Sequence, residues 1–196
     1  MNTAKEIPGY SEELRLTYDL TPDSIVLDAG GYRGDWAAAI SDRYGCNVIV
    51  LEPIKEFYRG IVNRFDGNRK VRVFNFALGA TSGTAEFGVQ NDSTGGFADS
   101  ENREIVRIET VTDVLSQIKE NVVDLMKINI EGGEWAVVPD LIKNGLIKRV
   151  VNLQIQWHPV GPGNQQLFDA LQRGLSQTHH LTFDSGWVWQ NWSLNK

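Results

Sequence analysis

Two short polar segments of the sequence are suited to binding a cofactor that carries a nucleoside. The first runs Asp28-Ala-Gly-Gly-Tyr-Arg-Gly34, directly after a β-branched run that begins at Ile25. Its glycines allow a sharp turn, and the free N–H groups of a following helix would face an anion. The second contains Glu52, 22 residues after Gly30, near the spacing of about 20 at which a carboxylate accepts both ribose hydroxyls.

Tyr32 distinguishes between two such cofactors. In the dinucleotide pattern Gly-x-Gly-x-x-Gly, the second glycine lets a pyrophosphate lie against bare backbone. Counted from Gly30, this place follows Gly31 and holds Tyr32, so a pyrophosphate would meet a bulky side chain. S-adenosylmethionine has no phosphate and would present only its methionine carboxylate there. The spacing up to Gly34 therefore favours S-adenosylmethionine, with an NAD-linked oxidoreductase as the alternative enzyme.

Polar side chains alternate along two predicted strands, residues 123–130 and 150–157. Alternate residues of a strand share a face, and central parallel strands are normally apolar on both faces. We expect the two polar faces to lie side by side and bond to each other, because an unpaired buried polar group costs about 1–3 kcal/mol. The alternative is a structural ion pair between Lys127 and a carboxylate. The polar positions are Lys127, Asn129, Glu131, Asn152, Gln154, Gln156 and His158.

Glu131 and His158 follow these two strands and are the candidate catalytic residues. If a hydroxyl accepts the methyl group of S-adenosylmethionine, it must lose its proton, which requires a base within about 2.6–3.2 Å. The ordinary pKa of histidine suits this role near neutral pH, although a histidine before Pro159 can also be a turn residue. A divalent metal held by Glu131 and Asn129 is a second interpretation, but without a dense acidic cluster we expect no metal.

The elements that would position these residues alternate as in a doubly wound α/β sheet. Helices are expected between the strands, one with Pro53 in its first turn and one that begins near Glu134. Such sheets bind ligands beyond the carboxyl ends of their strands, where the candidate residues lie. The parallel strands are predicted at residues 25–28, 48–51, 71–76, 123–130 and 150–157.

The remaining segments predict an insertion and a terminal hairpin within a single domain, residues 1–196. Turn residues around short strand-like runs indicate an antiparallel insertion at about 80–110, in which residues 90–102 are a candidate substrate lid. Residues 179–183 and 187–192 flank a turn signal and predict a hairpin. This hairpin completes a mostly parallel seven-stranded sheet with an antiparallel C-terminal strand. Its tryptophans are expected in the core or on a dimer face, so a homo-oligomer is one expectation.

Composition excludes several classes of function. The 196 residues include 19 Lys and Arg against 25 Asp and Glu, a net charge of −6 that disfavours nucleic acid and anionic membranes as partners. The single cysteine, Cys46, cannot form an internal disulfide and fits a reducing compartment. No signal peptide or membrane span is recognisable near the N-terminus. We therefore expect a cytoplasmic protein whose partner is neither nucleic acid nor a membrane.

The sequence resembles the FkbM-type S-adenosylmethionine-dependent methyltransferases over residues 25–158. The resemblance depends on residues 26–34, Val50-Leu-Glu-Pro53, Phe76-Ala-Leu-Gly79 and Leu125-Met-Lys-Ile-Asn-Ile-Glu-Gly-Gly-Glu134. The last block is similar to the family signature Leu-Lys-Ile-Asp-Val-Glu-Gly. The resemblance implies a Rossmann-like methyltransferase fold and methyl transfer to a hydroxyl oxygen of a sugar or another small molecule.

The resemblance also implies roles for individual residues. Asp28 would lie near the methionine part of the cofactor, Glu52 near the ribose, and the backbone of Phe76 near the adenine. Asn129 replaces the aspartate of the family signature, and Gln156 stands where the fifth strand often ends in glutamate. Because both changes remove a charge, a catalytically silent cofactor-binding module remains a further alternative. The expected cofactor-binding residues are Asp28, Gly30, Gly31, Tyr32, Gly34, Glu52, Pro53, Phe76, Ala77 and Asn129.

Overall fold

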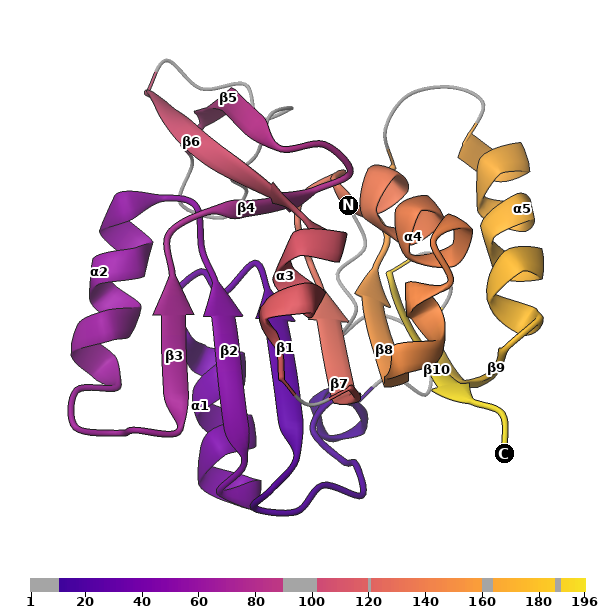
Figure 1. Cartoon of the computed structure of the whole chain (residues 1–196), viewed down its shortest axis with the longest axis horizontal. Helices are drawn as coiled ribbons and strands as arrows, with labels where there is room; N and C mark the ends of the chain where they lie inside the picture. The colour runs from indigo at the N-terminus through magenta and orange to yellow at the C-terminus, as the bar shows by residue number, and fades with distance from the viewer. Residues whose placement is uncertain (1–10, 90–101, 120, 160–163, 186–187) are drawn as a thin grey trace.

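A seven-stranded sheet forms the centre of the fold in the computed structural model, which describes residues 11–89, 102–119, 121–159, 164–185 and 188–196 (Figure 1). The strand order is β3-β2-β1-β7-β8-β10-β9. The first five strands in this order are parallel, whereas β10 lies antiparallel between β8 and β9. The predicted fold class and the antiparallel last strand are confirmed. The strands are β1 (Ile25–Ala29), β2 (Asn47–Leu51), β3 (Val71–Phe74), β7 (Val123–Ile128), β8 (Val150–Gln156), β9 (His179–Asp184) and β10 (Trp189–Leu194).

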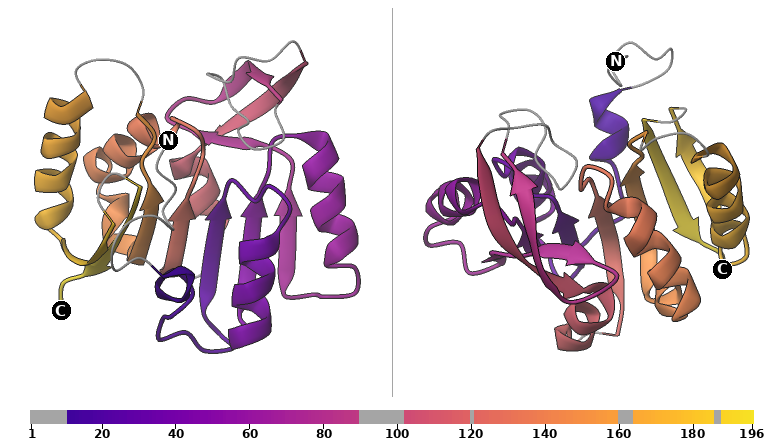
Figure 2. Two further views of the ribbon diagram at one scale, coloured as in Figure 1. Left: turned by 180° about the vertical axis from the view of Figure 1, so that it is seen from behind. Right: turned by 90° about the horizontal axis from the view of Figure 1, so that it is seen from above.

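Helices cover both faces of this sheet (Figure 2). On one face, α1 and α2 pack with the chain around Leu16 and Tyr18 against Val26 and Val48. On the other face, α3, α4 and α5 pack against a larger apolar cluster that includes Leu27. Alternate residues of β1 therefore enter different cores, which places Asp28 on the α1 face. The helices are α1 (Asp35–Tyr44), α2 (Lys55–Arg64), α3 (Val111–Gln117), α4 (Glu134–Lys143), α5 (Asn164–Ser176), and the 3₁₀ turns η2 (Glu12–Arg15) and η3 (Leu146–Arg149).

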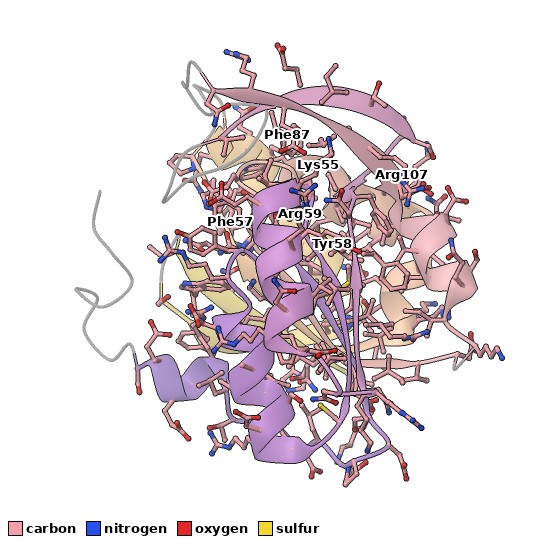
Figure 3. All side chains as sticks on the ribbon, turned by 90° about the vertical axis from the view of Figure 1, so that its left-hand side faces the viewer. Lys55, Phe57, Tyr58, Arg59, Phe87 and Arg107 are labelled. Carbon is pink, nitrogen blue, oxygen red and sulfur yellow. The ribbon has the colours of Figure 1, made fainter. Side chains whose placement is uncertain are left out.

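A second, three-stranded sheet lies beyond the carboxyl ends of β2 and β3 (Figure 1). It consists of β4 (Ala77–Gly79), β5 (Gly83–Gly88) and β6 (Arg103–Thr110). The β5–β6 pair is antiparallel as expected for the insertion, but β4 joins β6 in parallel. Phe57 of α2 and Phe87 of β5 belong to a small apolar cluster beneath this sheet, near the start of α2 (Figure 3).

Several element boundaries differ from the sequence prediction, most of them by one or two residues. The third strand ends at Phe74 rather than residue 76, because Asn75 turns the chain by donating from Nδ2 to the carbonyls of Glu52 and Pro53. Pro53 lies before the N-cap of α2 and not in its first turn, because the turn held by the Glu52 side chain comes first. The fourth parallel strand ends at Ile128 rather than residue 130.

The aromatic C-terminal segment belongs to the core. Trp157, Trp189 and Trp192 are 2%, 3% and 5% exposed, and the Trp157 ring contacts those of Trp135 and Phe168. Residues 90–101, most of the candidate lid, and Trp187 lie outside the described residues. None of the helices described is both long and apolar enough to span a membrane.

Candidate active site

The loop after β1 has the unusual backbone that its glycines predict. Gly30, Tyr32 and Gly34 all have positive φ, at 88°, 51° and 79°. A Cβ atom on Gly30 would lie 1.9 Å from the carbonyl oxygen of Asn129, so this glycine is required where the extensions of β1 and β7 meet. Tyr32 adopts a conformation that costs a non-glycine residue about 1–3 kcal/mol, a feature that clusters at functional sites.

Glu52 connects this loop to the end of β2. Its Oε2 accepts the Tyr32 N–H at 2.7 Å, and its Oε1 accepts the Ile54 N–H at 2.8 Å. The side chain is buried, and burial raises the pKa of Glu52 to about 7 against the effect of these two donors. Each carboxylate oxygen keeps a second lone pair, so Glu52 can hold the loop and still accept a ribose hydroxyl.

Asp28 and Lys127 form a buried ion pair between β1 and β7. Lys127 Nζ lies 2.7 Å from Asp28 Oδ1 and donates to the Gly30 carbonyl at 2.9 Å. Burial raises the pKa of the Asp28 carboxyl, and the charge and hydrogen bond of Lys127 oppose this effect. The structural ion pair that was the alternative for Lys127 is therefore present.

The polar faces of β7 and β8 lie side by side, as expected, but Lys127 and Gln154 bond to other segments. The register places Lys127 opposite Gln154 on the same side of the sheet. Gln154 Nε2 donates to the Arg15 carbonyl at 3.0 Å and to the Tyr18 hydroxyl, both in the segment before β1. The predicted bonding between the two faces is present at their ends, where His158 contacts Glu131. Lys127 and Gln154 do not bond to each other, because β1 and the N-terminal segment supply their partners.

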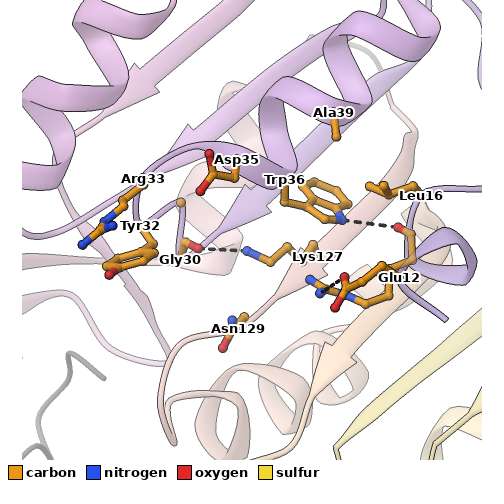
Figure 4. A pocket seen from close by; sticks show the side chains of 12 residues that line it. Glu12, Leu16, Gly30, Tyr32, Arg33, Asp35, Trp36, Ala39, Lys127 and Asn129 are labelled. Atoms are coloured by element: carbon orange, nitrogen blue, oxygen red, sulfur yellow. Dashed lines mark hydrogen bonds and ion pairs between the residues drawn. The ribbon is translucent and has the colours of Figure 1, made fainter. Parts of the chain in front are cut away.

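A cavity of about 310 Å³ opens on the α1 face beside this ion pair (Figure 4). It brings together four of the expected cofactor-binding residues, Gly30, Gly31, Tyr32 and Asn129. Asp28, Gly34, Glu52 and Pro53 are not part of the lining, but Asp28 is bonded to the lining residue Lys127. The lining residues are Glu12, Arg15, Leu16, Gly30, Gly31, Tyr32, Arg33, Asp35, Trp36, Ala39, Lys127 and Asn129.

Two buried side-chain oxygen atoms, one of a lining residue and one of the buried ion pair, have no hydrogen-bond partner in the described part of the chain. They are Asp28 Oδ2 and Asn129 Oδ1. A buried acceptor without a donor costs about 1–3 kcal/mol, so such atoms point to a donor supplied by a ligand. The ammonium group of a methionine moiety is a donor of this kind. The residues present therefore fit S-adenosylmethionine, whose methionine part was expected near Asp28.

Phe76 and Ala77 lie where the chain passes from β3 to β4, and both are 7% exposed. The Phe76 side chain belongs to the apolar cluster on the α3 face and lines a separate cavity of about 90 Å³ there. Because its ring points away from the α1 face, only the backbone of this segment is available to an adenine on the α1 side.

Glu131, His158 and Glu134 form a cluster beyond the ends of β7 and β8. His158 Nε2 lies 3.3 Å from Glu131 Oε1, and His158 Nδ1 lies 2.9 Å from Glu134 Oε1. Glu134 is fully buried and also accepts the N–H groups of His158 and Gly132, at 2.7 and 2.9 Å. Glu131 is 29% exposed and has a positive φ of 50°, so the turn after β7 rather than strand alternation directs its side chain.

This cluster changes the expected protonation of His158. Burial lowers the pKa of His158, but the hydrogen bonds and charges of Glu131 and Glu134 outweigh burial and raise it to about 9. The imidazole is therefore protonated at neutral pH and has no free nitrogen to accept a proton. Of the two expected catalytic residues, Glu131 is the one whose chemistry suits a base.

Glu134 is the residue whose importance sequence reasoning missed. It was assigned only to the start of a helix, and it does begin α4. Its side chain turns back, however, so that Oε2 accepts the Gly132 N–H. The spacing Glu131-Gly-Gly-Glu134 is the one signal in the sequence that could have indicated it. Among the described residues, no group of three or more His, Cys, Asp or Glu is placed to hold a metal ion.

Comparisons with known proteins identify the family and the fold. The methyltransferase FkbM domain profile matches residues 28–182, whereas no curated protein matches the sequence. The fold is similar to that of a putative rRNA methylase from Clostridium thermocellum, with a TM-score of 0.59, 8% identity and coverage of 94% of this chain and 93% of that one. Aeropyrum pernix fibrillarin with natively bound S-adenosyl-L-methionine gives a TM-score of 0.53, 9% identity, and coverage of 90% and 67%.

The METTL16 methyltransferase domain gives a TM-score of 0.55 with 15% identity over 94% of this chain. The chain spans 65% of that domain, less than two thirds of its length. At these identities the structural likeness concerns the fold, and the profile match carries the family assignment. Because that match runs from Asp28 at the end of β1 to β9, the chain belongs to the FkbM family of S-adenosylmethionine-dependent methyltransferases.

Proposed function

We propose that this protein methylates a hydroxyl oxygen of a sugar or another small molecule. The observation that carries the proposal is the Glu131 carboxylate, which is partly exposed beyond β7 and held by His158. Asn129, two residues earlier, lines the cavity that fits the cofactor. A neutral hydroxyl acceptor needs a base to take its proton, and a carboxylate at this position can serve as that base. A more reactive amine or thiolate would not need one.

The cofactor would be held by the loop after β1 and by the ends of β2 and β7. When bound, S-adenosylmethionine supplies a methyl group on a positively charged sulfur. Asn129, which lines the cavity, offers its unpaired oxygen to its ammonium group. Glu52 offers its remaining lone pairs to the ribose. Most of these side chains are held by hydrogen bonds in the protein, so little ordering is required on binding.

Glu131 receives the proton of the acceptor hydroxyl as the oxygen takes up the methyl group. The carboxyl is then neutral and returns the proton to solvent after the product leaves. His158 keeps its own proton because of Glu134, so its Nε2–H acts as a fixed donor that orients Glu131. Much of the remaining acceleration comes from alignment of the acceptor with the reacting carbon.

The proposed acceptor is small or glycan-like rather than a nucleic acid. Some proteins of similar fold are an rRNA methylase and fibrillarin, but this chain carries a net charge of −6, which disfavours a polyanionic substrate. A cytoplasmic location is part of the same proposal, supported by the free buried thiol of Cys46.

Two measurements test this function. Calorimetry with S-adenosylhomocysteine and NAD should show binding of the first only, and Glu52→Ala should weaken it. A screen of hydroxyl-bearing acceptors for S-adenosylhomocysteine release should then identify turnover. We expect Glu131→Gln to lower turnover by about 10²–10⁴-fold with cofactor affinity unchanged. Glu109→Gln is the matched control, since that side chain is 25% exposed, close to the 29% of Glu131, and lies on β6.

Each possible outcome of these measurements would support a different alternative to the proposed function. Tight NAD binding without S-adenosylhomocysteine binding would indicate an oxidoreductase. Cofactor binding without turnover across the acceptors would indicate a silent binding module. Full activity in the Glu131→Gln protein would reject this residue as the base.

A further inference from the structure

Arg15 brings a partly buried cation to the cofactor cavity from outside the sheet. It ends η2, and its side chain is only 13% exposed. Its guanidinium lies over the Trp189 ring, 3.7 Å from the ring centroid, and Nε donates to Gln154 Oε1 at 3.4 Å. Nη1 pairs with Glu12 Oε2 at 2.9 Å. These contacts from two strands and the η2 turn hold the guanidinium at the wall of the cavity.

Arg15 differs from the other cations that line the cavity. The charge of Lys127 is matched at 2.7 Å by the buried carboxylate of Asp28. Arg33 is exposed and lies 5.0 Å from the Tyr32 ring. The Arg15 side chain is only partly exposed, yet its carboxylate partner Glu12 is 49% exposed, so solvent weakens that pair. Of the described lining residues, Arg15 is therefore the cation best able to attract a second anion.

The guanidinium also has donors to spare. Of its five N–H groups, the hydrogen bonds of the described residues use one on Nε and one on Nη1. The unpaired Asn129 Oδ1 is another lining atom, and it is an acceptor. A cavity with a spare cationic donor and a spare buried acceptor is complementary to a zwitterion, which carries a carboxylate and an ammonium group on one carbon.

We propose that Arg15 binds the carboxylate of the methionine part of the cofactor, so that the η2 turn forms part of the cofactor site. This inference depends on the cofactor assignment, and it adds the residue that binds the carboxylate at the amino-acid end of the cofactor. A guanidinium can hold a carboxylate through two parallel hydrogen bonds, which a lysine cannot reproduce.

The test compares ligands with and without the carboxylate charge by calorimetry. The ligands are S-adenosylhomocysteine, its carboxamide and 5′-methylthioadenosine, which lacks the amino-acid group. Wild-type protein should bind the carboxamide about 10- to 100-fold more weakly than S-adenosylhomocysteine, because a charge-assisted pair is lost. Arg15→Met should bind S-adenosylhomocysteine more weakly by a similar factor and should no longer distinguish it from the carboxamide. The affinity for 5′-methylthioadenosine should stay within about twofold.

Arg43→Met is the matched control. Arg43 also pairs with a glutamate of the N-terminal segment, Glu13, at 2.6 Å, and its guanidinium lies 5.7 Å from the Tyr44 ring, but it does not line the cavity. We expect this variant to bind all three ligands like the wild type. Arg15→Lys should recover part of the lost affinity.

Several results would overturn the inference. One is equal affinity of the wild type for S-adenosylhomocysteine and the carboxamide, which needs no variant and is independent of the folding of Arg15→Met. Another is an Arg15→Met protein that still distinguishes the two ligands. A third is an Arg15→Met protein whose affinity for 5′-methylthioadenosine falls as much as its affinity for S-adenosylhomocysteine. A wild-type protein that binds none of the three ligands would instead overturn the cofactor assignment, and the two failures are thereby distinguished.

Discussion

Replacement of His158 by glutamine should change how the stability of the protein depends on pH. His158 lies between Glu131 and Glu134, and its pKa is raised from about 6.5 to about 9 in the folded protein. The protonated imidazole therefore stabilises the fold. This stabilisation is fully present below pH 6.5, where the unfolded chain is also protonated, and it is lost as the pH rises through 9.

The size of this stabilisation follows from the difference between the unfolded and folded pKa values of His158. Each pKa unit corresponds to about 1.36 kcal/mol, so a change from 6.5 to 9 gives roughly 3 kcal/mol at most. The His158 side chain is 20% exposed, and solvent screening reduces the contribution, so we expect about 2–3 kcal/mol. In the variant an amide still donates a hydrogen bond but carries no proton that titrates.

The assay is urea unfolding of both proteins at several pH values from 6 to 9.5, followed by tryptophan fluorescence. The stability advantage of the wild type should shrink across this range. The raised pKa of Glu52, about 7, makes both proteins lose stability between about pH 4.5 and 7, so the difference between the two proteins removes its contribution.

Parallel stability profiles for the wild type and His158→Gln from pH 6.5 to 9 would refute the reasoning. A direct NMR titration of the imidazole with a midpoint near 6.5 would do the same. Either result would mean that the His158 imidazole is neutral near pH 7 and is available as the base.

Two further substitutions test the framework of the site by the same unfolding assay. Lys127→Met should destabilise the protein by about 3–5 kcal/mol because Asp28 is left buried and unpaired, whereas Lys55→Met, in an exposed ion pair, should change stability by less than about 1 kcal/mol. Equal effects would contradict the buried-pair interpretation. Gly30→Ala should cost at least about 3 kcal/mol because its Cβ would overlap a facing carbonyl, but Gly45→Ala, also at positive φ with no atom within 4 Å, should cost about 1–2 kcal/mol. A Gly45→Ala protein as unstable as Gly30→Ala would show that backbone strain alone explains both.

Most of the fold was accessible from local sequence patterns. Hydrophobic runs and glycine signals predicted the order of strands and helices along the chain, and Gly45 ends α1 in the left-handed conformation that glycine favours. Boundaries were less accurate where a side chain distant along the chain redirects the backbone. Asn75 ends β3 through the carbonyls of Glu52 and Pro53, an interaction that no local pattern contains.

The candidate site, like the fold, was only partly predictable from the sequence. Residue types and spacing were sufficient to identify the glycine loop, Glu52 and the two polar runs, because these signals lie within short segments of the chain. Only the tertiary structure decided their partners and charges. His158 lies between two carboxylates, Glu131 in the turn after β7 and Glu134 at the start of α4. Arg15 approaches the cavity from a segment before β1. Protonation and ligand recognition depend on burial and on distances between segments, which the one-dimensional pattern does not encode.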